Sequence, residues 1–337
     1  MPSDPPFVSI LVAARNEEQT IGRCLDALRQ QEYPKEKLEV IVVNDGSTDK
    51  TGKILEERAT FHQNLRVLEL PQKQTHNKAM ALTHGVKAAR GEVLLTTDAD
   101  CVPSATWVGS MAAEFNSETA LVAGPVIEHD HSRFIARLSK LEFLGLIATA
   151  AGLIGLNRPI ICNGANLAFR KSAFEKAGGF GNGIYATEDE VLMNRIYERN
   201  LGAIRFAGKP AAIVKTDGPK NITDFLRQRI RWSSKRKTFD DRSILLFLVL
   251  LYLYFAATLA GAVLCFSYPF MLLPVGISFL LKCAVDASVL HEGGRLLDVP
   301  LRWSDFLIAE LFHVPYIVVA AFLGQFKTLS WKGRTIR

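Results

Sequence analysis

Apolar and polar positions alternate in a regular order along the first third of the chain. Continuous apolar runs, each the length of a buried strand, occupy residues 8–14, 40–43, 65–70 and 93–97. Apolar side chains at helical spacing fill the stretches between them, at residues 17–31, 49–61 and 76–89. Strands that alternate with helices predict right-handed crossovers and a sheet covered on both faces. We therefore expect a Rossmann-like α/β core.

The middle of the chain continues this pattern. It predicts a helix over residues 106–115, a strand over 121–127 and a helix over 133–156 that carries no charge after Glu142. The last of these is expected to be too short to cross a bilayer. It fits a buried core helix or an interfacial helix equally well.

Polar residues follow three of the predicted strands. They are Arg15, Asn16 and Glu17 after the first strand, Asn44 to Ser47 after the second, and Asp98 and Asp100 after the fourth. Ligands of open parallel sheets bind beyond the carboxyl ends of the strands. The sequence therefore predicts a binding site at this edge of the sheet.

The Asp98-Ala99-Asp100 triplet has the chemistry of a metal site. Two carboxylates offer hard oxygen ligands to Mg²⁺ or Mn²⁺, and such an ion can also hold a diphosphate. A DxD triplet alone is weak evidence because it occurs by chance and also suits a polar loop, but its place at a strand end favours the metal. Asp45 is a candidate for hydrogen bonding to a base or ribose, although Asn-Asp-Gly-Ser is also an ordinary turn sequence.

The C-terminal third is strongly apolar. Residues 243–281 contain no acidic, basic or histidine side chain, and this length is enough for two crossings with a turn at Tyr268-Pro269. A third apolar segment, residues 306–326, contains Glu310, His313 and Pro315. It is expected to span, re-enter or lie in the interface. Together with a mean hydropathy of +0.12, these segments indicate an integral membrane protein.

Basic residues flank the apolar region on both sides. The segment RQRIRWSSKRK at 227–237 and the tail at 327–337 carry no acidic residue. By the positive-inside rule both ends are expected to be cytoplasmic, with an even number of crossings and the preceding domain in the cytosol. Nucleic acid is not an expected partner, because the charge is concentrated beside a membrane segment rather than along a groove.

Several other chemistries are disfavoured. The five cysteines form no CxxC pair, which argues against a disulfide framework and a zinc site. Residues 46–53 resemble a P-loop, but Ile54 stands where a magnesium-binding Ser or Thr belongs. The glycines at 178–183 do not form GxGxxG after the first strand, so a nicotinamide enzyme is not expected.

The segment 228–232, QRIRW, fits the pattern QxxRW through Gln228, Arg231 and Trp232. This is the most specific short motif in the chain. The same segment is also typical of an amphipathic interfacial helix with a Trp anchor and snorkelling arginines, and both interpretations can hold at once.

Taken in order from residue 8 to residue 232, the motifs resemble the family 2 glycosyltransferases, which have a GT-A fold. The resemblance is to their membrane-embedded QxxRW branch, with polysaccharide synthases and ceramide glucosyltransferase. The matching segments are Ala14-Arg15-Asn16-Glu17, Asn44 to Asp49, Asn77-Lys78-Ala79, Asp98-Ala99-Asp100, Asn163-Gly164-Ala165-Asn166, Thr187-Glu188-Asp189 and QRIRW.

This resemblance implies roles for individual residues. Asp189 matches the general base, although acids at 188–190 also suit a helix N-terminus for electrostatic reasons alone. The donor-binding residues would be Glu17, Asp45, Lys78, Asp98 and Arg231. Asp98 and Asp100 would hold the Mg²⁺ or Mn²⁺ ion, and Gln228 and Trp232 would face the acceptor or the diphosphate.

The resemblance also implies an organisation and an activity. We expect a cytosolic GT-A catalytic domain at 1–225, a mixed sheet flanked by helices, a basic interfacial helix at 226–242, a membrane region at 243–326 and a basic tail at 327–337. The expected activity is inverting transfer from a nucleotide sugar, with uridine diphosphate as the expected carrier, to a lipid or membrane-associated acceptor. The alternatives are a processive polysaccharide synthase subunit that needs an export partner, and a catalytically inactive membrane scaffold with a nucleotide-binding fold.

Overall fold

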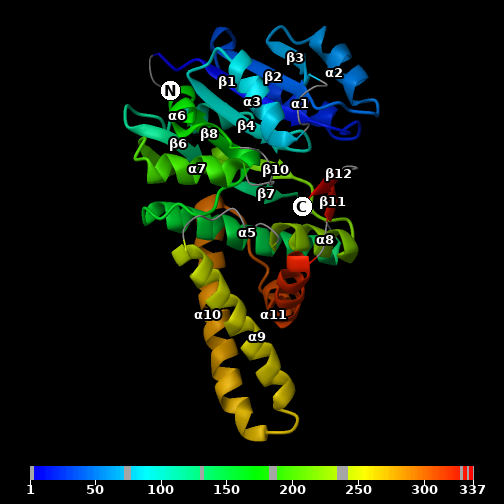
Figure 1. The fold of residues 1–337 in the computed structure, drawn as a ribbon, viewed down its shortest axis with the longest axis vertical. Coiled ribbons are helices and arrows are strands. Elements are labelled where there is room, and N and C mark those ends of the chain that lie inside the picture. Colours follow the sequence, from blue (N-terminus) through cyan, green and yellow to red (C-terminus); the bar gives the residue numbers. More distant parts are fainter. Residues whose placement is uncertain are drawn as a thin grey trace. The chain divides into compact units, whose positions relative to one another are not determined.

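The computed structural model describes residues 4–71, 77–129, 133–181, 188–233, 242–326, 329–331 and 334–336. The chain forms two compact units. The first unit comprises Met1–His129 and Thr149–Asp217, and the second comprises Asp130–Ala148 and Gly218–Arg337. Their elements are labelled in Figure 1, and each unit is described by itself.

A seven-stranded mixed sheet forms the centre of the first unit. Its order is β3 (Leu65–Glu69), β2 (Leu38–Asn44), β1 (Val8–Ala14), β4 (Val93–Asp98), β8 (Leu167–Arg170), β6 (Thr119–Ala123) and β9 (Ala203–Phe206). The first four are parallel, whereas β8 is antiparallel to both β4 and β6. The four N-terminal strands predicted from apolar runs are confirmed, and the sheet is mixed as expected.

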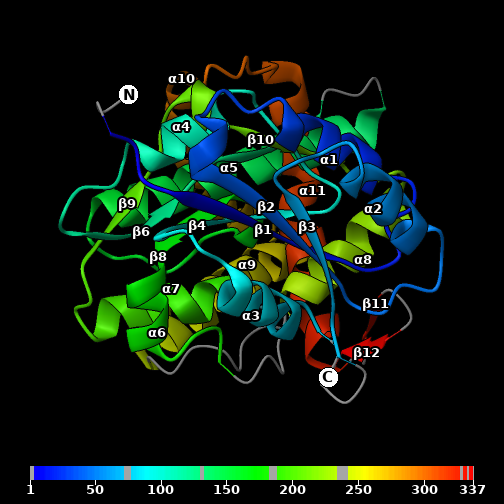
Figure 2. The ribbon, with the colours of Figure 1, turned by 90° about the horizontal axis from the view of Figure 1, so that it is seen from above.

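Helices cover both faces of this sheet. As Figure 2 shows, α3 (Lys78–Ala88), α6 (Lys171–Ala177) and α7 (Glu188–Glu198) lie on one face, and α1 (Ile21–Arg29), α2 (Thr51–Ala59) and α4 (Trp107–Ala112) on the other. Leu11, Ile41 and Leu94 belong to the core cluster under the first set of helices and are fully buried. Each such side chain contributes about 1.5–3 kcal/mol through burial. The apolar runs became strands because both of their faces are covered.

One predicted strand is wrong. The sequence pattern predicts a single strand over 121–127, but the chain breaks at Gly124 and Pro125. The first part is β6, and the second part, β7 (Val126–Glu128), joins a separate sheet with β10 (Val214–Thr216) and β5 (Val102–Pro103). Pro125 has no N–H for a sheet ladder, and a Cβ at Gly124 would overlap the Asn166 amide. The apolar composition of residues 121–127 does not reveal this break, because both strands are buried.

The second unit is mainly helical. It contains the first part of α5 (Phe134–Gly155), then α8 (Ile222–Ser233), α9 (Arg242–Leu264), α10 (Leu272–Leu297) and α11 (Trp303–Phe326). The chain ends in a small antiparallel hairpin, β11 (Leu329–Trp331) with β12 (Arg334–Ile336), which the sequence pattern does not predict. Residues 234–241, 327–328, 332–333 and 337 lie outside the described residues, so parts of the predicted basic helix and tail are not described.

Four helices are long and apolar enough to cross a membrane: α5, α9, α10 and α11. The helices α9 and α10 run side by side, joined by a short turn of helix at Pro269–Met271, as predicted (Figure 1). The expectation that α5 is too short to cross is wrong, because its 22 residues match the length of a spanning helix. The second helix also extends beyond Lys282, to Leu297.

Candidate active site

The loops that follow β1 and β2 are bonded to each other. Asn16 accepts a hydrogen bond from the backbone N–H of Thr48 at 2.8 Å, and Arg15 Nη1 donates to the carbonyl oxygen of Asp45 at 2.6 Å. Gly46 has a φ of 64°, a left-handed conformation that favours glycine. These contacts hold two strand ends that are thirty residues apart in sequence. The two segments therefore form one wall of the sheet edge.

Asp45 and Glu17 belong to this wall. Asp45 is buried, with 4% of its surface exposed, and Glu17 is half-buried and accepts a hydrogen bond from the Thr20 hydroxyl at 2.9 Å. Both lie at the strand ends where the sequence places them. Their roles in donor binding stay predictions.

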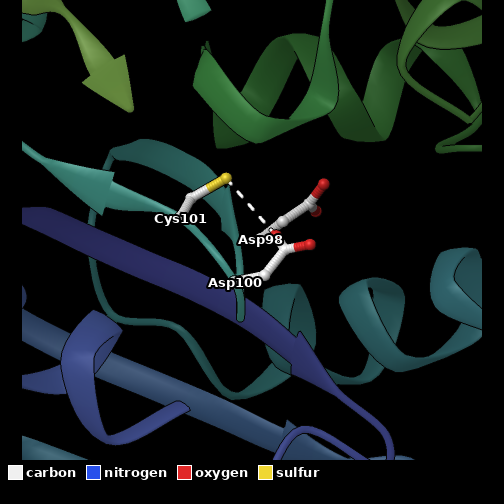
Figure 3. A group of neighbouring side chains, drawn as sticks. All are labelled: Asp98, Asp100 and Cys101. Atoms are coloured by element: carbon white, nitrogen blue, oxygen red, sulfur yellow. Dashed lines mark hydrogen bonds between the residues drawn. The ribbon is translucent and has the colours of Figure 1, made fainter. Parts of the chain in front are cut away.

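The DxD triplet lies at the end of β4. The carboxylates of Asp98 and Asp100 and the thiol of Cys101 have ligand atoms within 4.8 Å of one another. Figure 3 shows the three side chains side by side, with Cys101 Sγ donating to Asp100 Oδ1 at 3.5 Å. Burial, together with the neighbouring Asp98 carboxylate, raises the pKa of Asp100. A cation bound beside two such carboxylates reduces the repulsion between them.

These residues fit a divalent metal ion. Asp98 and Asp100 supply the hard oxygen donors that Mg²⁺ and Mn²⁺ prefer, and both are only partly buried. The close approach of these two carboxylates, whose ligand atoms lie within 4.8 Å of one another, is the observation that favours a positive ion at this place. The Cys101 thiol is a soft group and is not needed for either metal.

Lys78 connects the DxD triplet to a second acidic pair. Its Nζ lies 2.6 Å from Asp98 Oδ1 and 3.2 Å from Glu188 Oε1. Asn77 caps α3 by accepting the N–H of Met80, which fixes Lys78 at the first turn of that helix. Burial alone would lower the pKa of Lys78, but the carboxylates of Asp98 and Glu188 raise it well above its ordinary value. Lys78 is therefore a permanent cation at the centre of the site.

Asp189 occupies the first turn of α7, as the sequence predicts. Its Oδ2 accepts the backbone N–H of Gly164 at 2.6 Å, and the carbonyl oxygen of Gly164 accepts the Thr96 hydroxyl at 2.7 Å. This chain of hydrogen bonds ties Asp189 to strand β4, which also carries Asp98. The carboxylate is held in one orientation, with its second oxygen outside this bond.

Two residues of the matching segments, Glu188 and Asn166, were given no role from the sequence. Glu188 is 5% exposed, and burial raises its pKa while Lys78 opposes that effect. Its place beside Asp189 was the available signal. Asn166 is fully buried; it accepts Trp107 Nε1 and donates to the carbonyls of Pro125 and Ala212, each at 2.8 Å. Asn166 is therefore structural, which the motif alone does not reveal.

The remaining predicted residues belong to the second unit. Gln228, Arg231 and Trp232 lie on α8, and all three are half-buried. The structure thus brings together Lys78, Asp98 and Glu188 within the first unit. It describes the three residues of α8 within the second unit.

Comparison with known proteins identifies the family of this chain. The model of "Glycosyl transferase family 2" matches residues 9–178, which is half of the chain. The "Probable glycosyltransferase YdaM" of Bacillus subtilis is 33% identical over 68% of this chain and 54% of its own length. The "Beta-monoglucosyldiacylglycerol synthase" of Nostoc sp. is 31% identical over 68% of this chain and 48% of its own length. The chain thus spans about half the length of these relatives.

A solved structure supports the fold. The mannosyltransferase PcManGT of Pyrobaculum calidifontis, in complex with GDP-Man and Mn²⁺, superposes with a TM-score of 0.58 at 21% identity. The match covers 96% of this chain and 88% of that one. At this identity the likeness establishes the fold alone. Together with the mixed sheet and the family match, it shows that the chain belongs to glycosyltransferase family 2 and has the GT-A fold.

Proposed function

We propose that the chain is an inverting, metal-dependent glycosyltransferase that transfers a sugar from a nucleotide sugar to a lipid or membrane-associated acceptor. The observation that carries this proposal is the position of Lys78. It lies between Asp98, a predicted metal ligand, and Glu188, the neighbour of the predicted base Asp189. One cation thus connects the predicted metal site to the helix turn that carries the predicted base.

The proposed chemistry uses the two groups differently. A hydroxyl of the acceptor attacks the anomeric carbon, its proton passes to Asp189, and the bond from that carbon to the diphosphate breaks with inversion. The Gly164 N–H holds one oxygen of Asp189, so the other is available for the proton. A metal ion held by Asp98 and Asp100 would supply positive charge to the leaving diphosphate.

Two cationic side chains are assigned to offset the negative charge of the diphosphate. Lys78 is charged throughout the physiological range because its pKa is raised, and we assign Arg231 to the same diphosphate. Asp45 and Glu17 are assigned to the nucleoside, with uridine diphosphate as the expected carrier. Gln228 and Trp232 are assigned to the acceptor or the diphosphate.

The acceptor is inferred to be a lipid or a membrane-bound glycan. Four apolar helices suggest membrane association, and a relative at 31% identity is named as a glucosyldiacylglycerol synthase. The basic residues beside the apolar region support a cytoplasmic membrane with the catalytic domain in the cytosol.

The test is transfer by the full chain in lipid nanodiscs. Nucleotide sugars, including UDP-glucose, UDP-N-acetylglucosamine and GDP-mannose, are supplied one at a time with a lipid extract, and the lipids and glycans are read by mass spectrometry. We expect one donor to add a single hexose or N-acetylhexosamine to a lipid, with release of a nucleoside diphosphate. A ladder of products would favour the processive alternative. Donor binding without any product would favour the inactive scaffold.

Metal dependence is tested in the same assay. We expect EDTA to abolish transfer and Mn²⁺ or Mg²⁺ to restore it, because the crowded carboxylates need a cation to bind a diphosphate. In Asp100→Ala, the affinity for the donor in the presence of metal should fall at least about tenfold. The control is Asp26→Asn. Asp26 lies on α1 and pairs with Arg58 of α2. Full activity in EDTA would remove the metal from the proposal.

A further inference from the structure

The arginine between the defining residues of QxxRW, Arg229, contacts side chains on both α5 and α8. Arg229 is 5% exposed, and its guanidinium pairs with Glu142 on α5 through Nε at 2.7 Å and Nη2 at 2.6 Å. Its Nη2 also donates to the Ser139 hydroxyl at 3.2 Å. Both nitrogens contact the same oxygen, Glu142 Oε2, and together with the Ser139 bond they fix the direction of the planar guanidinium.

Two aromatic rings enclose the same guanidinium. Its central carbon lies 4.5 Å from the centre of the Phe225 ring and 4.4 Å from that of Trp232. Trp232 in turn stacks on Phe143 of α5, with ring centres 5.8 Å apart. The indole is therefore held between Arg229 and Phe143. Its orientation depends on the arginine, because a flat cation attracts the face of a ring.

Arg229 also fixes the amide of Gln228. Its Nη1 donates to Gln228 Oε1 at 2.6 Å. An arginine has only donors, so the amide oxygen must face it, and the amide NH₂ points elsewhere. Gln228 thus presents two N–H donors, which suit an oxygen of a phosphate or a sugar hydroxyl.

We propose that Arg229 is the positioning residue of this motif. It orients the Trp232 ring and turns the Gln228 amide so that its NH₂ can donate to an oxygen of the bound substrate. The inference rests on the proposed transferase function and assigns a role to a residue that QxxRW leaves unspecified. Glu142 on α5 is the anchor through which Arg229 acts.

A partly buried ion pair elsewhere in the same unit provides a control. Arg137 on α5 pairs with Asp305 on α11 through two contacts of 3.1 Å, and Asp305 is 7% exposed. It joins the same α5 helix to α11. Arg229→Lys and Arg137→Lys both keep the charge but replace a planar guanidinium, which contacts its carboxylate through two nitrogens, by an ammonium. A purely structural role predicts the same outcome for both.

The experiment compares these variants as folded proteins in nanodiscs, well below their melting temperatures. For Arg229→Lys we expect kcat to fall at least about tenfold with KM for the donor changed less than about threefold, because ground-state binding uses other groups. Arg137→Lys should keep wild-type kcat. Glu142→Gln should also lower kcat, and the double variant Arg229→Lys/Glu142→Gln should be no slower than Arg229→Lys, because both act through one contact.

Two further readouts do not depend on overall stability. The emission of Trp232, obtained by difference from Trp232→Phe, should become more accessible to acrylamide in Arg229→Lys but not in Arg137→Lys. Gln228→Glu keeps an oxygen for Arg229 and loses the NH₂ donors, so it should lower kcat/KM at least about tenfold without lowering the melting temperature.

The proposal is overturned if Arg229→Lys and Arg137→Lys have equal kcat, or if quenching of Trp232 is unchanged in Arg229→Lys. A wild-type chain that transfers no sugar would instead reject the proposed function. In that case the quenching measurement still tests the positioning of Trp232, so the two failures are distinguishable.

Discussion

Single residues of the site are held by hydrogen bonds and ion pairs within the first unit. Asp189 is tied to Gly164, and Lys78 is placed by the Asn77 cap and paired with two carboxylates. Each group can meet a substrate without first paying for its own ordering, which is the basis of preorganised catalysis. A single substitution at one of these positions therefore removes an identified contact.

Asp189→Asn is expected to abolish transfer while keeping donor affinity within about threefold. The amide retains an oxygen for the Gly164 N–H but cannot accept the proton of an acceptor hydroxyl, so the loss should be at least about 10²-fold. Single-turnover transfer and donor titration are the measurements. Glu198→Gln, at the exposed end of the same helix, is the control. Wild-type turnover in Asp189→Asn would reject Asp189 as the base.

Glu39 on β2 is expected to make stability depend on pH. It is fully buried; burial alone would raise its pKa, but hydrogen bonds from Ser9, Arg90 and Arg66 overcome this and lower the pKa below 4.5. A lowered pKa in the folded state adds stability above the unfolded value, and that stability is lost as the pH falls through the folded value.

The corresponding measurement compares wild type with Glu39→Gln by thermal unfolding between pH 3 and pH 7. We expect the wild type to be more stable by about 1–3 kcal/mol near pH 7, and the difference to shrink below about pH 4. Glu36→Gln, at an exposed position, should show no such trend. A difference that grows on acidification would contradict the sign of this shift.

Elements of the second unit are joined by close backbone approach as well as by charge. The helices α8 and α11 meet where the Ser233 hydroxyl donates to the Ala320 carbonyl at 2.8 Å, and where the rings of Phe225 and Tyr316 lie 5.2 Å apart. Gly324 lies at this contact. The helix that carries QxxRW is thus held by α11 as well as by α5.

Gly324→Ala is expected to disturb this packing. The added methyl would overlap the Ser233 hydroxyl and lie 3.0 Å from the Ile230 carbonyl oxygen, so one helix must move. We expect a loss of about 1–3 kcal/mol, read as a lower melting temperature in nanodiscs. Gly276→Ala on α10, where a Cβ meets nothing within 4 Å, should be neutral or slightly stabilising. Equal effects of the two changes would rule out the proposed close contact.

The whole molecule combines a GT-A domain with helices that need an apolar solvent. Large side chains such as Phe247, Leu250 and Leu280 are more than half exposed on α9 and α10. An exposed apolar surface of this extent is not stable in water. The fold as a whole therefore indicates association with a bilayer.

The chain is accordingly expected to stay with membranes after washing in alkaline carbonate and to be released only by detergent. The spans Leu245–Leu264 and Pro269–Leu297 are 20 and 29 residues long and strongly apolar, which makes their insertion favourable. Fractionation followed by immunoblotting against an added tag is the measurement. Recovery of the chain in the carbonate supernatant would exclude insertion of α9 and α10.

Local sequence patterns predicted much of the secondary structure of this protein. Buried strands and apolar spans appear in the sequence as runs of neighbouring apolar residues. The strands β1 to β4 and the turn at Pro269 were therefore predictable. Asp98 and Asp100 were predicted as candidates because a strand end is also a local feature, whereas Asp189 was predicted from the resemblance to the family.

Only the tertiary structure decided which distant groups meet. The split of residues 121–127 between two sheets, the Lys78 contact with Glu188 and the pairing of Arg229 with Glu142 all join segments far apart in sequence. A charged residue looks the same in a sequence whether it faces solvent or a buried partner. Desolvation and pairing are properties of the folded neighbourhood, and they distinguish a positioning arginine from a surface one.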